Sequence, residues 1–331
     1  KTLTANEKAT IQAMYDKLET RLNDSQIFSS SDLDLVKDGL TAFGLFEKYT
    51  SSSTGSPSSS SSGTTETSEK DADETVNKGD EIAEDIESKP GDKAADDVND
   101  YIEKDVDNVL EDKNVDVDKA IEVVSKVKEL VEKLLDKEDL SADKAAEVTL
   151  KVIDNTVSKL LDKEDIDAED GSKIVKDVLE NIVDKAISKD DMSVEKAKEI
   201  VEKVIENNIK QVIEKDTEGI ETDVVKEKLA EIVSKVVSKA GNVAEDKVKV
   251  EATEKEAKVS VDTKDLEAAV ENATRVAEDL AKKLKENGAE DVADKVKKEV
   301  VIAVPEEANK KEEVKVELPT DILKKLAESD V

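Results

Sequence analysis

The sequence predicts a mainly α protein: an antiparallel array of helical repeats, with a repeat length of about 26 per helix and turn, and a smaller C-terminal α+β module. Two observations predict this fold class. Lys133, Lys159 and Lys185 begin equivalent segments ("KLLDKEDLSADKAAE", "KLLDKEDIDAEDGSK" and "KAISKDDMSVEKAKE"), so the period in sequence numbering is 26 (159 − 133 = 26 and 185 − 159 = 26). After about Asp246 the apolar residues alternate as in strands. One helix plus one turn, repeated, is typical of an open array and of a closed bundle, and both are compatible with the sequence.

Each repeat carries a stripe of aliphatic residues at helical spacing. In the copy that ends at Leu161 the stripe consists of Ala145, Val148, Val152, Ile153, Val157, Leu160 and Leu161. A helix of roughly twenty residues spans about 30 Å, and short connections make neighbouring helices antiparallel. Glu129–Lys133 and Glu147–Lys151 sit at i,i+4 and add about 0.2–0.5 kcal/mol each. The apolar stripe therefore supplies most of the stability.

Four segments follow from the changes in composition. Residues 1–49 hold five of the six aromatic residues and predict a helical hairpin. Residues 50–68 form a Ser/Gly/Thr-rich flexible linker, with an O-glycosylated stalk as the alternative. Residues 69–245 form the acidic helical repeat array, whose first narrow helices break at "KPGD" (Lys89–Asp92). Residues 246–331 form the α+β module.

The module is predicted from alternation and from helix-end signals. Two strands contain Val248, Val250 and Ala252, then Val259 and Val261, joined by a turn at "TEKE". A long helix runs from an N-cap at Thr263 to Gly288. "VVIAVP" (300–305) and "EVKVELP" (313–319) are predicted strands, and "TDILKKLAESD" begins a last helix. That helix has no predicted partner, so we expect the natural module to continue beyond residue 331.

Charge and composition exclude several functions. Among 331 residues the formal charge is −33, with 41% charged and 2% aromatic residues. Such acidity repels nucleic acid and anionic lipid, so neither is an expected partner. The chain has no Cys and no His, which removes thiolate and imidazole catalysis and Cys/His zinc sites. No apolar run is long enough for a membrane span. We therefore expect no enzyme activity, no catalytic residues and no cofactor.

The repeated acids invite comparison with a calcium loop. Starting at Asp165, the EF-hand pattern finds Asp167 and Glu169 at positions 3 and 5, but Asp170 at position 6 and Lys176 at position 12 do not fit. We therefore predict no metal-binding residues, only weak, non-specific cation binding.

What recurs at these turns is the signal for the start of a helix. An apolar residue precedes Asp or Ser, and an acid follows two residues later. Asp116, Ser141, Asp167 and Ser193 are thus predicted N-caps. The acid in the first turn then faces the positive end of the helix dipole.

The linker and the ending "VKVELPTDILKKLAESDV" resemble Gram-positive (clostridial-type) cell-surface proteins of the S-layer-associated class. The resemblance implies a secreted, modular protein with extracellular repeats, and it implies no catalytic residues. These residues contain no wall-anchoring module. We expect a non-enzymatic structural spacer or scaffold protein, extracellular on a bacterial cell surface, with other surface proteins or cell-wall polymers as partners. The alternatives are an adhesin or wall-polymer binding module acting through the α+β part, and a cytosolic acidic assembly or chaperone-like protein.

Overall fold

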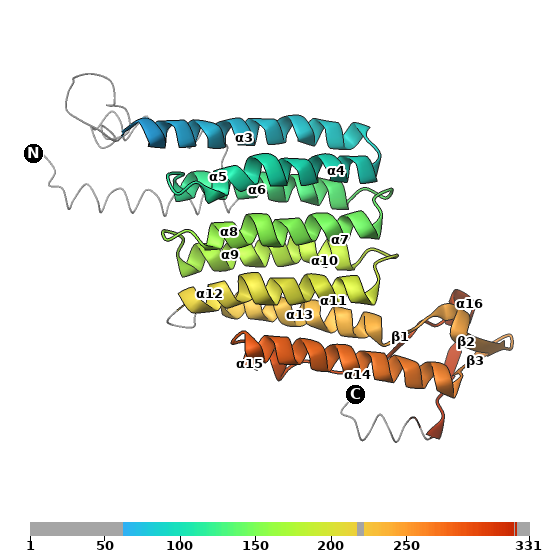
Figure 1. Ribbon diagram of the computed structural model, residues 1–331. Coiled ribbons are helices and arrows are strands. Elements are labelled where there is room, and N and C mark those ends of the chain that lie inside the picture. The colour runs from blue at the N-terminus through green and yellow to red at the C-terminus, as the bar shows by residue number, and fades with distance from the viewer. Residues whose placement is uncertain (1–61, 217–221, 321, 323–331) are drawn as a thin grey trace, which may run out of the picture. The chain divides into compact units, whose positions relative to one another are not determined.

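The computed structural model describes residues 62–216, 222–320 and residue 322. The predicted hairpin at 1–49, most of the predicted linker and nearly all of the last helix lie outside these residues. The described part is mainly helical with a few short strands, which confirms the predicted fold class (Figure 1).

The helices follow one another as antiparallel segments of the predicted period. Several segments contain a turn of π-helix (η) and are continuous through it, because the junction residues keep right-handed helical angles. The segments are α3 (Ser62–Ser88); α4 (Gly91–Tyr101), η1 (Ile102–Val106) and α5 (Asp107–Glu111); α6 (Val117–Leu135); α7 (Ala142–Lys151), η2 (Val152–Val157) and α8 (Ser158–Leu161); α9 (Ala168–Val178), η3 (Leu179–Val183) and α10 (Asp184–Ile187); α11 (Val194–Lys203), η4 (Val204–Ile209) and α12 (Lys210–Lys215); and α13 (Asp223–Ala240).

The start of α3 corrects the predicted linker. Residues 62–68, assigned to the linker by their Ser/Gly/Thr content, begin this helix. Ser68 is buried, and its hydroxyl donates to Asp112 at 2.5 Å. A contact 44 residues away in sequence therefore orders a segment whose composition predicts a flexible chain.

The segments stack in two rows, because each one packs against the segment two places along the chain. One row contains α3, α6, α9–α10 and α13, and the other contains α4–α5, α7–α8, α11–α12 and α14 (Thr263–Glu286). In Figure 1, α3 lies at one end of the stack and α14 at the other. The array is therefore an open stack of helices.

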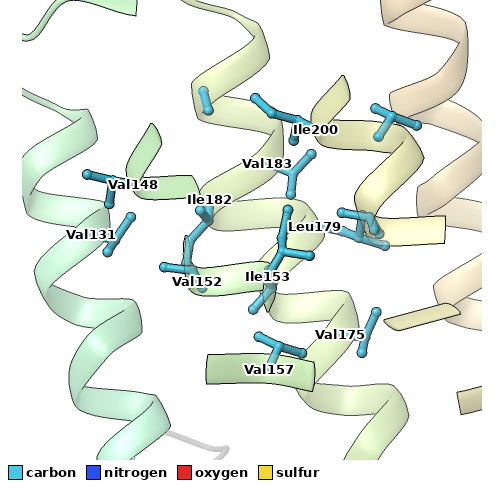
Figure 2. Close-up of a cluster of buried hydrophobic side chains, with 14 of the residues drawn as sticks. Val131, Val148, Val152, Ile153, Val157, Val175, Leu179, Ile182, Val183 and Ile200 are labelled. Carbon is cyan, nitrogen blue, oxygen red and sulfur yellow. The ribbon is translucent and has the colours of Figure 1, made fainter. Parts of the chain in front are cut away.

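One continuous core runs through the array. The predicted stripe of the α7–α8 segment is buried along its whole length, and Val152, Ile153 and Val157 meet Leu179 and Ile182 of the next segment (Figure 2). Burying a side chain of this size contributes about 1.5–3 kcal/mol. Aliphatic packing between successive segments thus supplies the cohesion that the stripe predicts.

The C-terminal region differs from the predicted module in its boundary. The antiparallel pair β2 (Val248–Ala252) and β3 (Glu256–Val261) confirms the two alternating strands. The helix α14, however, belongs to the array: Ala273, Val276, Ala277, Leu280 and Leu284 lie in the continuous core. The boundary predicted at residue 246 therefore does not separate two cores, since α14 supplies the last helix of its row.

The remaining elements of this region are short. They are β1 (Asn242–Val243), a 3-10 turn (Glu245–Lys247), α15 (Glu290–Ala293), β4 (Val301–Ile302), α16 (Glu306–Asn309) and β5 (Glu313–Glu317). Only two residues of the predicted 300–305 strand pair, in parallel with β1. The N-cap residue of α14 is Asp262, one residue before the predicted Thr263. One three-stranded sheet has the order β2-β3-β5, with β3 and β5 parallel.

Candidate functional site

The repeated turns are the most regular feature of the molecule, and each begins the next helix as predicted. The four predicted N-cap side chains accept backbone N–H donors of the first turn: Asp116 from Asp118, Ser141 from Lys144, Asp167 from Asp170 and Ser193 from Lys196. The apolar residues that precede them are buried, namely Val115, Leu140, Ile166 and Met192. Each such cap contributes about 1 kcal/mol. The acids therefore act in starting helices.

The acidic residues compared above with a calcium-binding loop do not surround a common site. Asp167 is engaged in capping, with its carboxylate 2.9 Å from the backbone nitrogen of Asp170. Burial, together with the charges of Asp167 and Glu169, raises the pKa of Asp170. Across the described residues, no group of three or more acidic side chains is arranged to hold a metal ion.

A lysine at each turn connects it to the turn two helices earlier. We call Lys137, Lys163, Lys189, Lys215 and Lys239 the lysine ladder. The Nζ of Lys137 donates to the carbonyl of Ile86 at 3.0 Å, and the Nζ of Lys189 donates to the carbonyl of Lys137 at 2.7 Å. The Nζ of Lys239 then donates to the carbonyl of Lys189 at 3.3 Å. Each ladder residue in this series after the first thus binds the backbone of the one before it.

The other set of turns has the same arrangement. The Nζ of Lys163 donates to the carbonyl of Asp112 at 3.0 Å, and the Nζ of Lys215 donates to the carbonyls of Lys163 and Ile166 at 3.3 and 3.1 Å. The carbonyls of Asp112 and Lys163 lie just beyond helix C-termini, where a cation also complements the helix dipole. Burial lowers the pKa of Lys163, although the charges of Asp112 and Asp116 oppose that shift. The ladder lysines are half-buried, so their hydrogen bonds are partly shielded from water.

Backbone N–H groups of the turns are also paired between neighbouring turns. The N–H of Gly91 donates to Asp139 at 2.9 Å, and the N–H of Ser141 donates to Asp92 at 2.9 Å. Hydrogen bonding from Ser141 holds the pKa of Asp92 below its ordinary value. A Cβ at Gly91 would lie 2.6 Å from the backbone nitrogen of Leu140, so the two turns approach more closely than any other residue would permit.

Ion pairs also join neighbouring helices of one row, between residues within the helices as well as at the turns. Lys151 pairs with Glu103 at 2.5 Å and Lys128 with Asp177 at 3.0 Å. Lys196 pairs with Asp143, and Lys235 with Asp184. Each exposed pair of this kind contributes about 0–1 kcal/mol. The pairs therefore add little to the total stability, most of which comes from the aliphatic core.

The core contains a few polar groups at the π-helical turns. Asn208 in η4 is buried, and its amide lies 3.5 Å from the carbonyl of Ile153 in η2. The same carbonyl also accepts the backbone N–H of Ser158 at the end of the π-turn. The buried amide of Asn208 thus contributes to the contact between two neighbouring helices of one row.

A surface cavity of about 480 Å³ lies beside the turn that follows α8. Its lining includes Leu110, Glu111, Lys159 and Lys163. Lys159 pairs with Asp107 and Glu111, and Lys163 belongs to the lysine ladder. Two of the three lysines that line this cavity are thus already used in holding helices together, and the third is Lys113.

No known protein family matches the sequence, and no curated protein is significantly similar to it. None of the described helices is long and apolar enough to cross a membrane. The sequence indicated the N-caps but not the lysine ladder. The signal was present, because Lys137, Lys163, Lys189 and Lys215 recur with the period of the repeats (163 − 137 = 26).

Proposed function

We propose that this protein is a non-enzymatic structural spacer or scaffold, located outside the cell on a bacterial surface. The observation that carries the proposal is the lysine ladder, which joins each turn to the turn two helices away. Together with one core from α3 to α15, it makes neighbouring helices move as one body. A spacer must be rigid in this way if it is to hold other modules at a fixed distance.

The surface chemistry favours the same function. Tyr101, the only aromatic residue after residue 50, is buried, so the part of the chain that the structure describes presents no ring to a sugar. The charge of −33 keeps the surface hydrated and the chains apart. The extracellular location rests on the resemblance of the linker and the C-terminal segment to S-layer-associated proteins. Surface proteins or wall polymers would be the partners that the spacer connects.

Rigidity can be tested with two spin labels, because the chain has no native Cys. Lys70→Cys in α3 and Lys282→Cys in α14 place labels at the two ends of the array, on side chains that are 73% and 76% exposed. We expect one narrow distance distribution, unchanged when cell-wall polymer is added. The control pair, Lys264→Cys with Lys282→Cys, lies within α14 and reports the width that the labels themselves cause. A distribution much broader than the control, or one shifted by polymer, would contradict a rigid spacer.

Location needs a separate measurement. An antibody against the array should label intact cells of the organism that makes the protein. Labelling only after permeabilisation would contradict a surface protein and favour the cytosolic alternative.

A further inference from the structure

The three-stranded sheet has two edges without a strand neighbour among the described residues. Its order is β2-β3-β5, so β2 and β5 each pair on one side only. β2 and β3 lie to one side of the helical array, beyond the first turn of α14 (Figure 1). Edges of this kind present unpaired N–H and C=O groups that can bind another strand.

The two faces of this sheet differ in chemistry. The register places Val250 beside Val259 and Val259 beside Val316 on one face. Val259 is fully buried, but Val316 is 48% exposed and Val314 is 36% exposed. The apolar face thus continues to the β5 edge, where it is left uncovered within the described residues.

The opposite face carries a ladder of cross-strand ion pairs. Lys258 pairs with Glu317 at 2.8 Å, and Lys315 pairs with Glu256 at 3.3 Å. Both edges continue this pattern, with Lys249 and Glu251 on β2 and with Glu313, Lys315 and Glu317 on β5. The charges that an added strand must match are therefore defined at each edge.

The hydrogen bonds already made show which backbone groups are free. Thr253 N donates to Glu256 O at the hairpin, and Glu313 N donates to Lys255 O. Since donors alternate along a strand, the N–H groups of Val250 and Val316 point away from β3. These two valines are thus the residues that can meet across a new strand pair.

We propose that β5 binds the β2 edge of a second copy of this chain, antiparallel, with Val316 opposite Val250 of the second copy. This register places Lys315 opposite Glu251 and Glu317 opposite Lys249 of the second copy, and Val314 opposite Ala252. Apolar residues then lie on one face and opposite charges on the other, as they do within the sheet. A shift of two residues in either direction places Glu313 or Glu317 opposite Glu251, so the charges select one register.

The contact does not close on itself. Pairing β5 with β2 uses different surfaces of the two copies, so each added copy offers a fresh β5 edge, and both edges of every inner copy are satisfied. Pairing two β5 strands about Val316 also matches Lys315 with Glu317, but it stops at a dimer and leaves each β2 edge unpaired. The proposed assembly goes beyond the spacer function and does not depend on where the protein is located.

Charge repulsion sets the conditions for the assembly. Copies that carry −33 each repel one another at low salt. Raising the salt from about 0.01 M to about 1 M shortens the Debye length from about 30 Å to about 3 Å. Sedimentation velocity of the full chain should therefore show a mass that rises with concentration, passes the dimer and increases with salt.

Proline at an outward-facing position tests the β5 edge. Val316→Pro removes an N–H group that faces away from β3, so the β3–β5 hydrogen bonds remain. We expect this variant to be monomeric, with the circular dichroism of the original chain. Val316→Thr keeps the N–H group and the strand preference, so it should assemble.

A charge exchange tests the register and the β2 edge. Lys315→Glu or Glu251→Lys alone creates a like-charge pair between copies and should weaken association about tenfold. The double variant, Lys315→Glu with Glu251→Lys, restores opposite charges and should recover assembly. A β5–β5 dimer would be weakened by Lys315→Glu but not rescued by Glu251→Lys.

Three results would overturn the proposal. The first is a species that stops at the dimer, which would assign the contact to β5–β5 pairing. The second is assembly by Val316→Pro equal to that of the original chain. The third is a monomer at every concentration and salt; protection of the Val314 and Val316 amides from hydrogen exchange in that monomer would assign the edge to the chain's own C-terminal segment.

Discussion

Replacing Lys189 by methionine tests whether the lysine ladder stabilises the stack. The Nζ of Lys189 donates to the carbonyl of Lys137 at 2.7 Å, from a half-buried position just after α10. Methionine keeps an unbranched apolar stem and removes the ammonium group. The carbonyl of Lys137 then loses its charged donor and keeps the backbone N–H of Leu140, at 3.3 Å. A hydrogen bond to a charged group contributes about 1.5–3 kcal/mol. We therefore expect the free energy of unfolding to fall by about 2 kcal/mol.

Urea unfolding followed by circular dichroism measures this loss. The midpoint should fall at an unchanged m value, because the same surface is exposed on unfolding. For a unit of this size, about 2 kcal/mol corresponds to a Tm lower by about 4–8 °C.

Lys185→Met is the matched control for that variant. Lys185 lies one helical turn earlier, and its Nζ is also 2.7 Å from an oxygen, here a carboxylate oxygen of Asp136. Its acceptor is a surface carboxylate, since the Asp136 side chain is 64% exposed, so removal of the pair should cost about 0–1 kcal/mol. Equal losses in the two variants would refute the reasoning, because the ladder hydrogen bond would then be worth no more than a surface ion pair.

Three further results are expected. Gly91→Ala should destabilise by about 1–3 kcal/mol in urea unfolding, because its Cβ would meet backbone atoms at 2.6 Å. Gly171→Ala meets only side chains, of Leu161 at 3.1 Å and Val212 at 3.9 Å, and should stay within about 1 kcal/mol; similar losses in the two variants would contradict this. Tyr101→Phe removes a buried hydroxyl that donates to Thr75 O at 2.9 Å, and urea unfolding should show a loss of about 1–3 kcal/mol; no change would show that this bond does not hold α3. Hydrogen bonds from the Ser68 hydroxyl, which has the larger effect, and from the Asn114 N–H hold the pKa of Asp112 below its ordinary value of 3.8. The stability that this carboxylate contributes is therefore present above pH 3.8 and is lost as the pH falls through the lowered pKa. Asp112→Asn should therefore flatten the fall of Tm in this acid range, and an identical pH profile would contradict the assignment.

The starts of the helices show what can be predicted from residues that are close together in the sequence. Asp116, Ser141, Asp167 and Ser193 cap their helices as predicted, because an N-cap bonds only to the first turn of its own helix. The Glu129–Lys133 pair also forms, at 3.1 Å, on one helix face. These caps and this one i,i+4 pair were therefore predictable without the fold.

Contacts between distant segments were not predictable in this way. Lys151 is spaced to pair with Glu147, yet it pairs with Glu103 on the neighbouring helix of its row. The ladder lysines recur along the array, but their acceptors lie 49 to 52 residues away and become neighbours only when the rows stack. The same holds for Ser68, which joins α3 because Asp112 is beside it.

The sequence by itself determined that the chain is helical, where its helices begin and which side of each is apolar, because spacing and capping are local properties. Only the tertiary structure decided that the stack is open, that α14 completes one row and that β2 and β5 are left as edges. An apolar stripe requires some partner but does not specify which one. That choice is made by the fit of whole surfaces, by lysines that reach the turn two helices away, and by glycines that let two turns touch.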